Sequence, residues 1–102
     1  MSRDDPMRGF DTAFHAPVRL QIAAVLSKVD EAEFARLKAI ADVADSVLSK
    51  HLSALSEAGY VSLRKAALDG RQRTWVRITS AGRKAFAGHV EALRRLAAVG
   101  PS

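Results

Sequence analysis

The chain has 102 residues, the length of one domain, and its 48% hydrophobic content can build one core, which argues against wholesale disorder. Its apolar stretches are far shorter than the roughly 20 residues of a membrane-spanning helix, and its first ten residues lack a signal-peptide core. The absence of cysteine excludes disulfides and thiolate chemistry, so we expect a cytoplasmic protein. A net charge of +5 suits a polyanionic partner, although a basic domain with no such partner carries the same charge.

The N-terminal part of the chain predicts an arm followed by a helix. Residues 1–9 are polar and interrupted by Pro6 and Gly9, so we expect a flexible arm ahead of a domain over 10–99. Helical spacing is firm from Pro17, whose fixed φ suits a first turn. Leu20 lies off the apolar stripe of this helix, as expected of a helix covered on two sides.

Two shorter helices are predicted next, separated by a turn over 41–45. Asp30 with Glu33 has the spacing of a capping box, and Val29 with Phe34 has that of a hydrophobic staple. The second of the two helices is expected over about 45–58, with Asp45 as its cap. Gly59 is expected to adopt the left-handed conformation that ends many helices.

Beyond Gly59 the apolar spacing changes from helical to alternating. The stretches 60–65 and 74–78 read as strands, and Asp69-Gly70 between them is a strong hairpin signal, with a loop of two residues or more. Thr79 or Ser80 then caps a last helix, which is expected to end at Gly100-Pro101.

This order of elements describes a winged helix-turn-helix, a mainly helical α+β fold with a two-stranded hairpin wing. Three stretches in this order resemble the bacterial winged-helix transcriptional regulators of the MarR and ArsR type: HAPVRLQIAAVL, EFARLKAIADVADSVLSKHLSALSEAGYV and DGRQRTWVRITSAGRKAF. The resemblance covers roughly Phe14 to Leu96. It implies a homodimer that binds duplex DNA, with the helix over 45–58 in the major groove and the wing over 64–73 on the backbone or minor groove.

The sequence also departs from that family pattern. Ala44 stands where such proteins often carry a Ser or Thr cap, and Ala16 offers no capping hydroxyl before Pro17. The missing cysteines rule out the thiolate metal sensing of many ArsR proteins.

The helix over 45–58 has two unlike sides. Leu48, Leu52 and Leu55 recur on one side, which we expect to be buried. The opposite side has short hydroxyls and one cation, which permit close approach to base edges and phosphates; the expected DNA contacts are Ser46, Val47, Ser49, Lys50 and Ser53. An ordinary solvated side is the alternative. His51, at the edge of the apolar side, is expected to pack or hydrogen-bond within the domain.

The hairpin is rich in cations, with Asp69 as its one acid. We expect phosphate or minor-groove contacts from Arg64, Lys65, Arg71 and Arg73. Trp75 is expected to pack between the wing and a helix, with a clamp on the DNA backbone as the alternative, and Arg77 is ambiguous.

The last helix has more apolar residues than one covered side needs. The surplus predicts a subunit interface formed with the first helix, with candidate residues Leu20, Phe86, Val90, Leu93 and Leu96. His15 and His89 are weak evidence for a metal, so no metal site is expected. No phosphate loop, nucleophile elbow or carboxylate pair stands out, so we expect neither an enzyme nor a cofactor.

Together these observations predict a cytoplasmic transcriptional repressor that binds an inverted-repeat operator as a homodimer. The alternatives are a winged-helix protein-interaction module and an architectural DNA-binding protein without a preferred operator. The sequence names no effector, operator or target gene.

Overall fold

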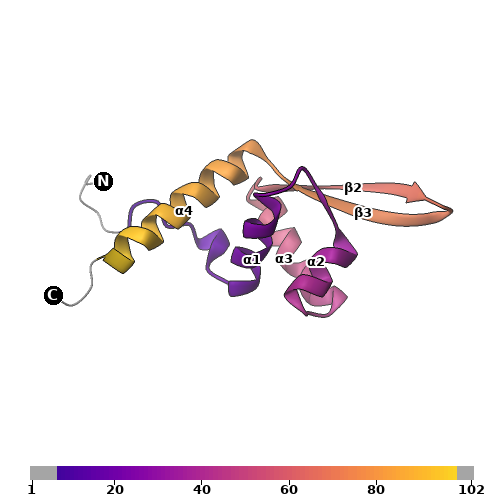
Figure 1. Ribbon diagram of the computed structural model, residues 1–102, viewed down its shortest axis with the longest axis horizontal. Coiled ribbons are helices and arrows are strands. Elements are labelled where there is room, and N and C mark those ends of the chain that lie inside the picture. Colours follow the sequence, from indigo (N-terminus) through magenta and orange to yellow (C-terminus); the bar gives the residue numbers. More distant parts are fainter. Residues whose placement is uncertain (1–6, 99–102) are drawn as a thin grey trace.

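The computed structural model describes residues 7–98. Its elements are the 3-10 helix η1 (Thr12–Phe14), α1 (Pro17–Leu26), β1 (Ala32–Glu33), α2 (Phe34–Ala41), α3 (Asp45–Glu57), β2 (Val61–Leu68), β3 (Arg71–Ile78) and α4 (Ser80–Ala98). Helices α1, α2 and α3 form the body, from which α4 and the β2–β3 hairpin extend in opposite directions (Figure 1). The predicted winged helix-turn-helix is confirmed.

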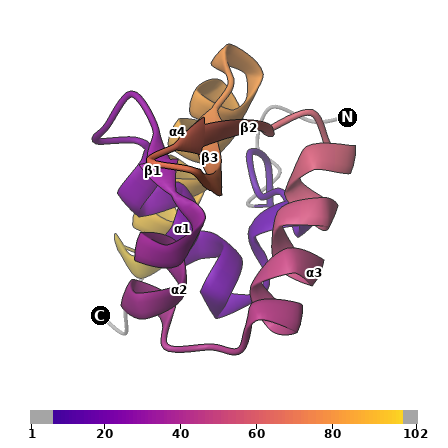
Figure 2. The same cartoon turned by 90° about the vertical axis from the view of Figure 1, so that its right-hand side faces the viewer.

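One core holds the body together. Its fully buried side chains come from η1, all three helices of the body and the sheet, and the largest are Phe14, Ile22, Leu26, Leu37, Leu48, Leu52, Leu55 and Val76. The view along the hairpin shows α3 and α2 on two sides of α1, with the sheet above them (Figure 2). This arrangement leaves the outer side of α3 uncovered.

The sheet has three strands where the sequence indicated two. The order is β1-β3-β2, all antiparallel, and the short β1 pairs Ala32 with Val76 and Glu33 with Trp75. Two residues are too few for alternation to be visible in a sequence. The extra strand ties the chain before α2 to the inner end of the hairpin.

The hairpin turn has two residues, the shortest length within the expected range of two or more. Asp69 and Gly70 both have positive φ, at 53° and 75°, as a type I′ turn requires. Leu68 pairs with Arg71 directly beside the turn, so the ladder runs unbroken to the end of the wing.

Two of the predicted caps are wrong. Helix α2 begins only at Phe34, because Glu33 lies in β1 and places its carboxylate on Arg73; the Asp30 capping box and the Val29–Phe34 staple therefore do not form. Helix α3 is preceded by Ala44, which makes no side-chain cap, and Asp45 instead forms an ion pair with Lys38 at 2.7 Å.

The predicted end of α3 and the predicted cap of α4 are confirmed. Gly59 has a φ of 81°, as expected after α3. Of the two candidates for the α4 cap, it is Thr79 whose hydroxyl accepts the Gly82 N–H at 2.9 Å. The expected end of this helix at Gly100-Pro101 and most of the expected 1–9 arm lie outside the described residues, and the 10–99 domain limits stay a prediction.

Gly82 marks the tightest packing between α4 and the rest of the domain. A Cβ at this position would lie 2.2 Å from the Tyr60 carbonyl oxygen and 2.8 Å from the Ile78 side chain. Gly88, in the same helix, has far more room, since its nearest neighbour would be the Gly9 carbonyl oxygen at 3.9 Å.

We therefore expect Gly82→Ala to lower the free energy of unfolding by about 2 kcal/mol or more, because the backbone of α4 must shift away from Tyr60. Gly88→Ala is the matched control, and it should be neutral or stabilising by up to about 1 kcal/mol through helix propensity. Urea unfolding of both variants measures the difference. Equal stability of the two would contradict the close approach.

Candidate DNA interface

The outer side of α3 has the residues expected to contact DNA. Leu48, Leu52 and Leu55 are at most 1% exposed and hold the inner side against the core. All five residues of the opposite side are exposed, namely Ser46, Val47, Ser49, Lys50 and Ser53. None of these five makes an ion pair or side-chain hydrogen bond with another residue of the described chain. Short side chains and one extended cation are thus presented to solvent.

A hollow separates α3 from the hairpin. It has a volume of about 350 Å³, and its walls are Ser49 and Ser53 on α3 and Leu63, Lys65 and Thr74 on the hairpin, with Phe34 and Leu52 also lining it. Leu63 pairs with Val76 and Lys65 with Thr74, so these side chains share the sheet face that continues from the core. Lys65 therefore faces the same space as the outer side of α3.

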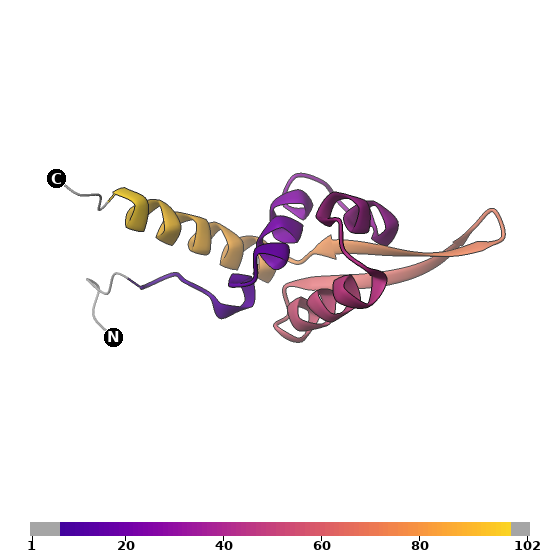
Figure 3. The same cartoon turned by 90° about the horizontal axis from the view of Figure 1, so that it is seen from below.

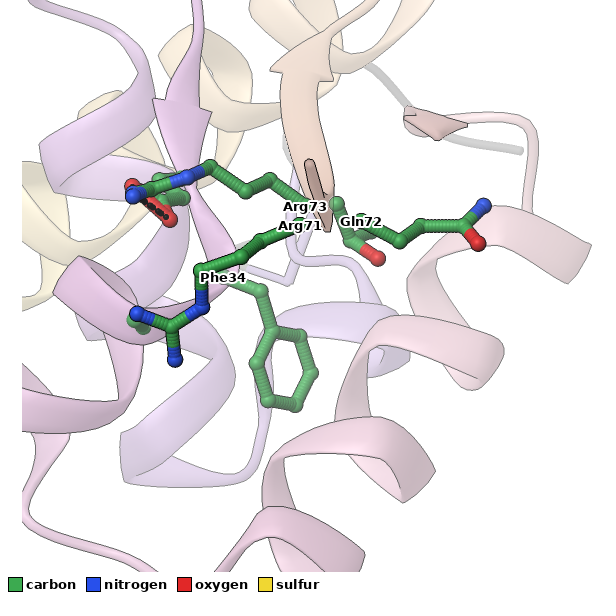
Figure 4. Close-up of a pocket in the computed structure, with 7 residues that line it drawn as sticks. Phe34, Arg71, Gln72 and Arg73 are labelled. Carbon is green, nitrogen blue, oxygen red and sulfur yellow. Dashed lines mark hydrogen bonds and ion pairs between the residues drawn. The ribbon is translucent and has the colours of Figure 1, made fainter. Parts of the chain in front are cut away.

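A second hollow, of about 340 Å³, lies between the hairpin and the start of α2. Its walls are residues 71–74 on the hairpin and, around the start of α2, Glu33, Phe34 and Ala35. Figure 4 shows Arg71 reaching down beside Phe34, whereas Gln72 points toward α3. Seen from below, α2 and α3 both lie at the root of the hairpin (Figure 3). Phe34 and Thr74 line both hollows, and we refer to the two hollows together as the concave region.

Two of the four wing cations are engaged within the chain. The Arg73 Nη1 donates to both carboxylate oxygens of Glu33 at 2.9 Å, and the Arg64 Nη2 lies 2.6 Å from the Glu31 Oε1. Both pairs neutralise charge beside the sheet. Lys65 and Arg71, by contrast, have no ion-pair partner among residues 7–98. Phosphate binding would therefore draw on these two first, because they need not exchange an existing partner.

The Trp75 ring lies beside Arg64 of the neighbouring strand, and its expected packing between the wing and a helix stays a prediction. Trp75 lies opposite Arg64 on β2 and Glu33 on β1, and the Arg64 guanidinium lies 5.9 Å from its ring centroid. This cation–π contact holds Arg64 on the outer sheet face. Arg77, two residues further on β3, is exposed and lies opposite Ser62.

The prediction for His51 is confirmed, since its Nδ1 accepts a hydrogen bond from the Arg19 Nε at 3.1 Å. Burial lowers the pKa of the His51 imidazole, and the charges of Arg19 and Lys50 lower it further. The neutral form of His51 is thus the acceptor for Arg19, and α1 is joined to the middle of α3 through this bond.

His15 and His89 lie near each other, where the segment before α1 meets α4. His89 is buried and accepts the Asp11 N–H on its Nδ1 at 3.0 Å, while the His15 ring lies 6.3 Å away between centroids. Among residues 7–98 no group of three or more potential ligands could hold a metal ion. Within the same range, none of the helices has both the length and the apolar character that crossing a bilayer demands.

The comparison with known proteins agrees with this geometry. Residues 18–97 match the winged helix DNA-binding domain family, which covers most of the chain. The chain belongs to this family. An uncharacterised protein of Methanocaldococcus jannaschii, MJ0432, is 35% identical to this winged helix protein over 83 residues, which are 81% of the chain and 90% of the relative.

Solved structures extend the comparison. A transcriptional regulator homologue from Pyrococcus horikoshii OT3 is 28% identical, with a TM-score of 0.79 over 84% of this chain and 85% of its own. TA0346 of Thermoplasma acidophilum, 23% identical with a TM-score of 0.69 over 87% and 91% of the two chains, shows the fold alone. This winged helix protein is a DNA-binding transcription regulator.

Sequence reasoning missed the acids that face the wing. Glu31 and Glu33 lie before α2, and only the pairing of β1 with β3 brings them beside Arg64 and Arg73. The local sequence around both acids predicts the start of a helix, so it contains no signal that places them beside the sheet. Arg19, the partner of His51, likewise comes from a distant helix.

The wing arginines should differ in their contribution to DNA binding. Arg71→Ala is expected to weaken DNA binding, because one phosphate contact is lost. The negative slope of log affinity against log salt should become shallower by about one. Arg73→Ala should change this slope less, since Arg73 is already paired with Glu33. Fluorescence anisotropy at several salt concentrations measures both slopes. Equal losses for the two variants would mean that Arg73 leaves Glu33 when DNA binds.

Proposed function

We propose that this regulator binds an inverted-repeat operator as a homodimer, in the cytoplasm, and represses transcription there. The observation that carries the proposal is the exposed side of α3, which presents three serines, Val47 and Lys50. Beside it, the wing over 64–73 has two cations, Lys65 and Arg71, without an ion-pair partner among residues 7–98. Phosphate contacts from Lys65 and Arg71 would set the position of the protein on the duplex. The exposed residues of α3 would then select the sequence.

The shape of the concave region supports this arrangement. An α-helix fits the major groove of B-DNA, and short side chains allow its backbone to come close to the base edges. Val47, which is 40% exposed, offers an apolar surface of the kind that contacts thymine methyl groups. Lys65 lines the hollow beside Ser49 and Ser53, where a sugar–phosphate strand leaving the groove would pass.

The apolar side of α4 supports the homodimer. Gly82, His89 and Ala92 are buried within the chain, whereas Leu93 and Leu96 are 37% and 54% exposed. Phe86 and Val90 are half-buried and line a shallow hollow of about 350 Å³ next to Arg83 and Arg94. Leu20 packs against the core of its own chain, so it would be a minor part of such an interface.

A dimer of this kind would place two α3 helices on one face of the duplex, and an operator bound by both would carry two related half-sites. Occupancy of such a site near a promoter obstructs polymerase, which is the reason for proposing repression.

The first test compares DNA sequences. Fluorescence anisotropy with a fragment from the gene's own upstream region and with a scrambled fragment should show a preference of about 10³-fold or more, with both affinities falling as salt rises. Lys50→Ala should reduce binding to the preferred fragment by about 1–3 kcal/mol if Lys50 contacts a base. Lys84→Ala, on the exposed surface of α4, is the matched control.

The pattern of losses separates the alternatives. A nearly equal loss on both fragments would assign Lys50 to a phosphate. Equal affinity of the unaltered protein for both fragments, and for selected genomic fragments, would favour an architectural role. Weak binding to all DNA with little salt dependence would instead favour a protein-interaction module.

The dimer has its own test. Leu93→Glu should convert the dimer to a monomer at micromolar concentration, because a carboxylate buried in an apolar interface loses its hydration without gaining a partner. Ala81→Glu changes the charge of α4 equally at an exposed position and should leave the dimer intact. Sedimentation velocity distinguishes the two. A monomer before any substitution, or a dimer that survives Leu93→Glu, would remove this face from the proposal.

A further inference from the structure

The segment before α1 lies along α4, which is remote from it in sequence (Figure 3). We refer to Met7–His15 as the N-terminal strap. Its main polar link to α4 is the hydrogen bond from the Asp11 N–H to the Nδ1 of His89, at 3.0 Å. The Arg95 guanidinium donates to the Arg8 carbonyl oxygen one to two turns further along α4.

Close packing accompanies these bonds. A Cβ at Gly9 would lie 2.9 Å from the Gly88 carbonyl oxygen and 3.5 Å from the Ala92 side chain, so the strap backbone rests directly on α4. The Phe10 ring meets the His89 ring edge-on, with 5.4 Å between centroids. His89 is thereby buried beneath the strap, with 3% of its surface exposed.

Asp11 also connects the strap to Tyr60, in the link between α3 and β2. Its carboxylate accepts hydrogen bonds from the Tyr60 hydroxyl and from the Ala13 N–H, and its backbone N–H is the donor to His89. The hydrogen bond to Asp11 raises the pKa of Tyr60, so this hydroxyl keeps its proton at neutral pH. One residue of the strap therefore contacts both α4 and Tyr60, which lies between α3 and β2.

The bond to His89 depends on the protonation state of the imidazole. Nδ1 can accept the Asp11 N–H only while it carries no proton, which assigns the neutral ring with its hydrogen on Nε2. A proton on Nδ1 would bring two donors face to face. It would also place a charge beside the rings of Phe10 and Phe14.

The charged and titratable groups around His89 shift its pKa in opposite directions. His15 faces it from the end of the strap, with 6.3 Å between ring centroids, and Asp11 faces it from the middle. Tyr60 reaches this site through Asp11, and Arg95 binds the strap further along α4. Burial and His15 lower the pKa of His89, and the attraction of Asp11 only partly offsets them.

We propose that the N-terminal strap is a latch on α4 that neutral His89 holds closed and that protonation of His89 opens. Opening uncovers the side of α4 that carries Gly88 and Ala92. The latch contributes its full stability above pH 6.5, the ordinary pKa of histidine, where the closed and open forms are both neutral. This contribution is lost as the pH falls from 6.5 toward the lowered pKa of the latched ring, because the open form binds the proton more tightly.

Nuclear magnetic resonance of the ¹⁵N-labelled full chain tests the latch. At about pH 7.5 the histidine spectra should show the Nε2–H tautomer of His89, and the Asp11 amide should be protected from hydrogen exchange. Between pH 6.5 and the pKa of His89 the protection factor of Asp11 should fall by about tenfold for each pH unit. Protection that persists after His89 has gained its proton would overturn the proposal.

A substitution without a titratable group separates His89 from its neighbours. The amide oxygen of His89→Asn can take the place of Nδ1 as acceptor, so Asp11 should stay protected as the pH is lowered. His15→Asn is the matched control and should retain the opening. Opening of His89→Asn at the same pH as the unaltered chain would assign the effect to another group and refute the latch. If His89→Asn does not fold, the titration of the unaltered chain decides alone.

Discussion

Burial of one side of α3 determines where every other functional element lies. Leu48, Leu52 and Leu55 occupy the centre of the core, and α1, α2 and the sheet all contribute to the same cluster. Because three consecutive turns of α3 are anchored in this way, the helix cannot rotate about its axis without exposing a leucine, at a cost of about 1.5–3 kcal/mol for each. The serines and Lys50 are therefore held outward by packing that involves none of them.

The three-stranded sheet likewise fixes the position of the wing through buried residues. Val61, Val76 and Ile78 bury the inner end of the hairpin, and β1 adds a further ladder there. The position of the wing relative to α3 is thus set by apolar contacts and backbone pairing. Charged residues contribute at the surface, where Arg73–Glu33 is partly screened and worth less than the core contacts beneath it.

Much of this structure could be predicted from local patterns. The helical spacing around Leu48 located α3, and Asp69-Gly70 located the turn to the residue, because both signals arise within a few positions of the chain. The start of α2 was misplaced because Glu33 satisfied a local rule for helix caps while its actual partners, Trp75 and Arg73, are some forty residues away. The state of the wing arginines was hidden for the same reason, since it depends on pairing across the sheet.

The third strand divides the hairpin into a three-stranded inner part and a two-stranded outer part. Among residues 7–98, strand β1 pairs only with Trp75 and Val76 of β3, so the hairpin from Lys65 to Thr74 is a two-stranded ribbon. Such ribbons twist and bend far more readily than sheets of three strands. The inner end of the wing is therefore fixed by the third strand, whereas its outer end can bend. Its free end can adjust its bend to the DNA that we propose it contacts, while its inner end stays paired with β1.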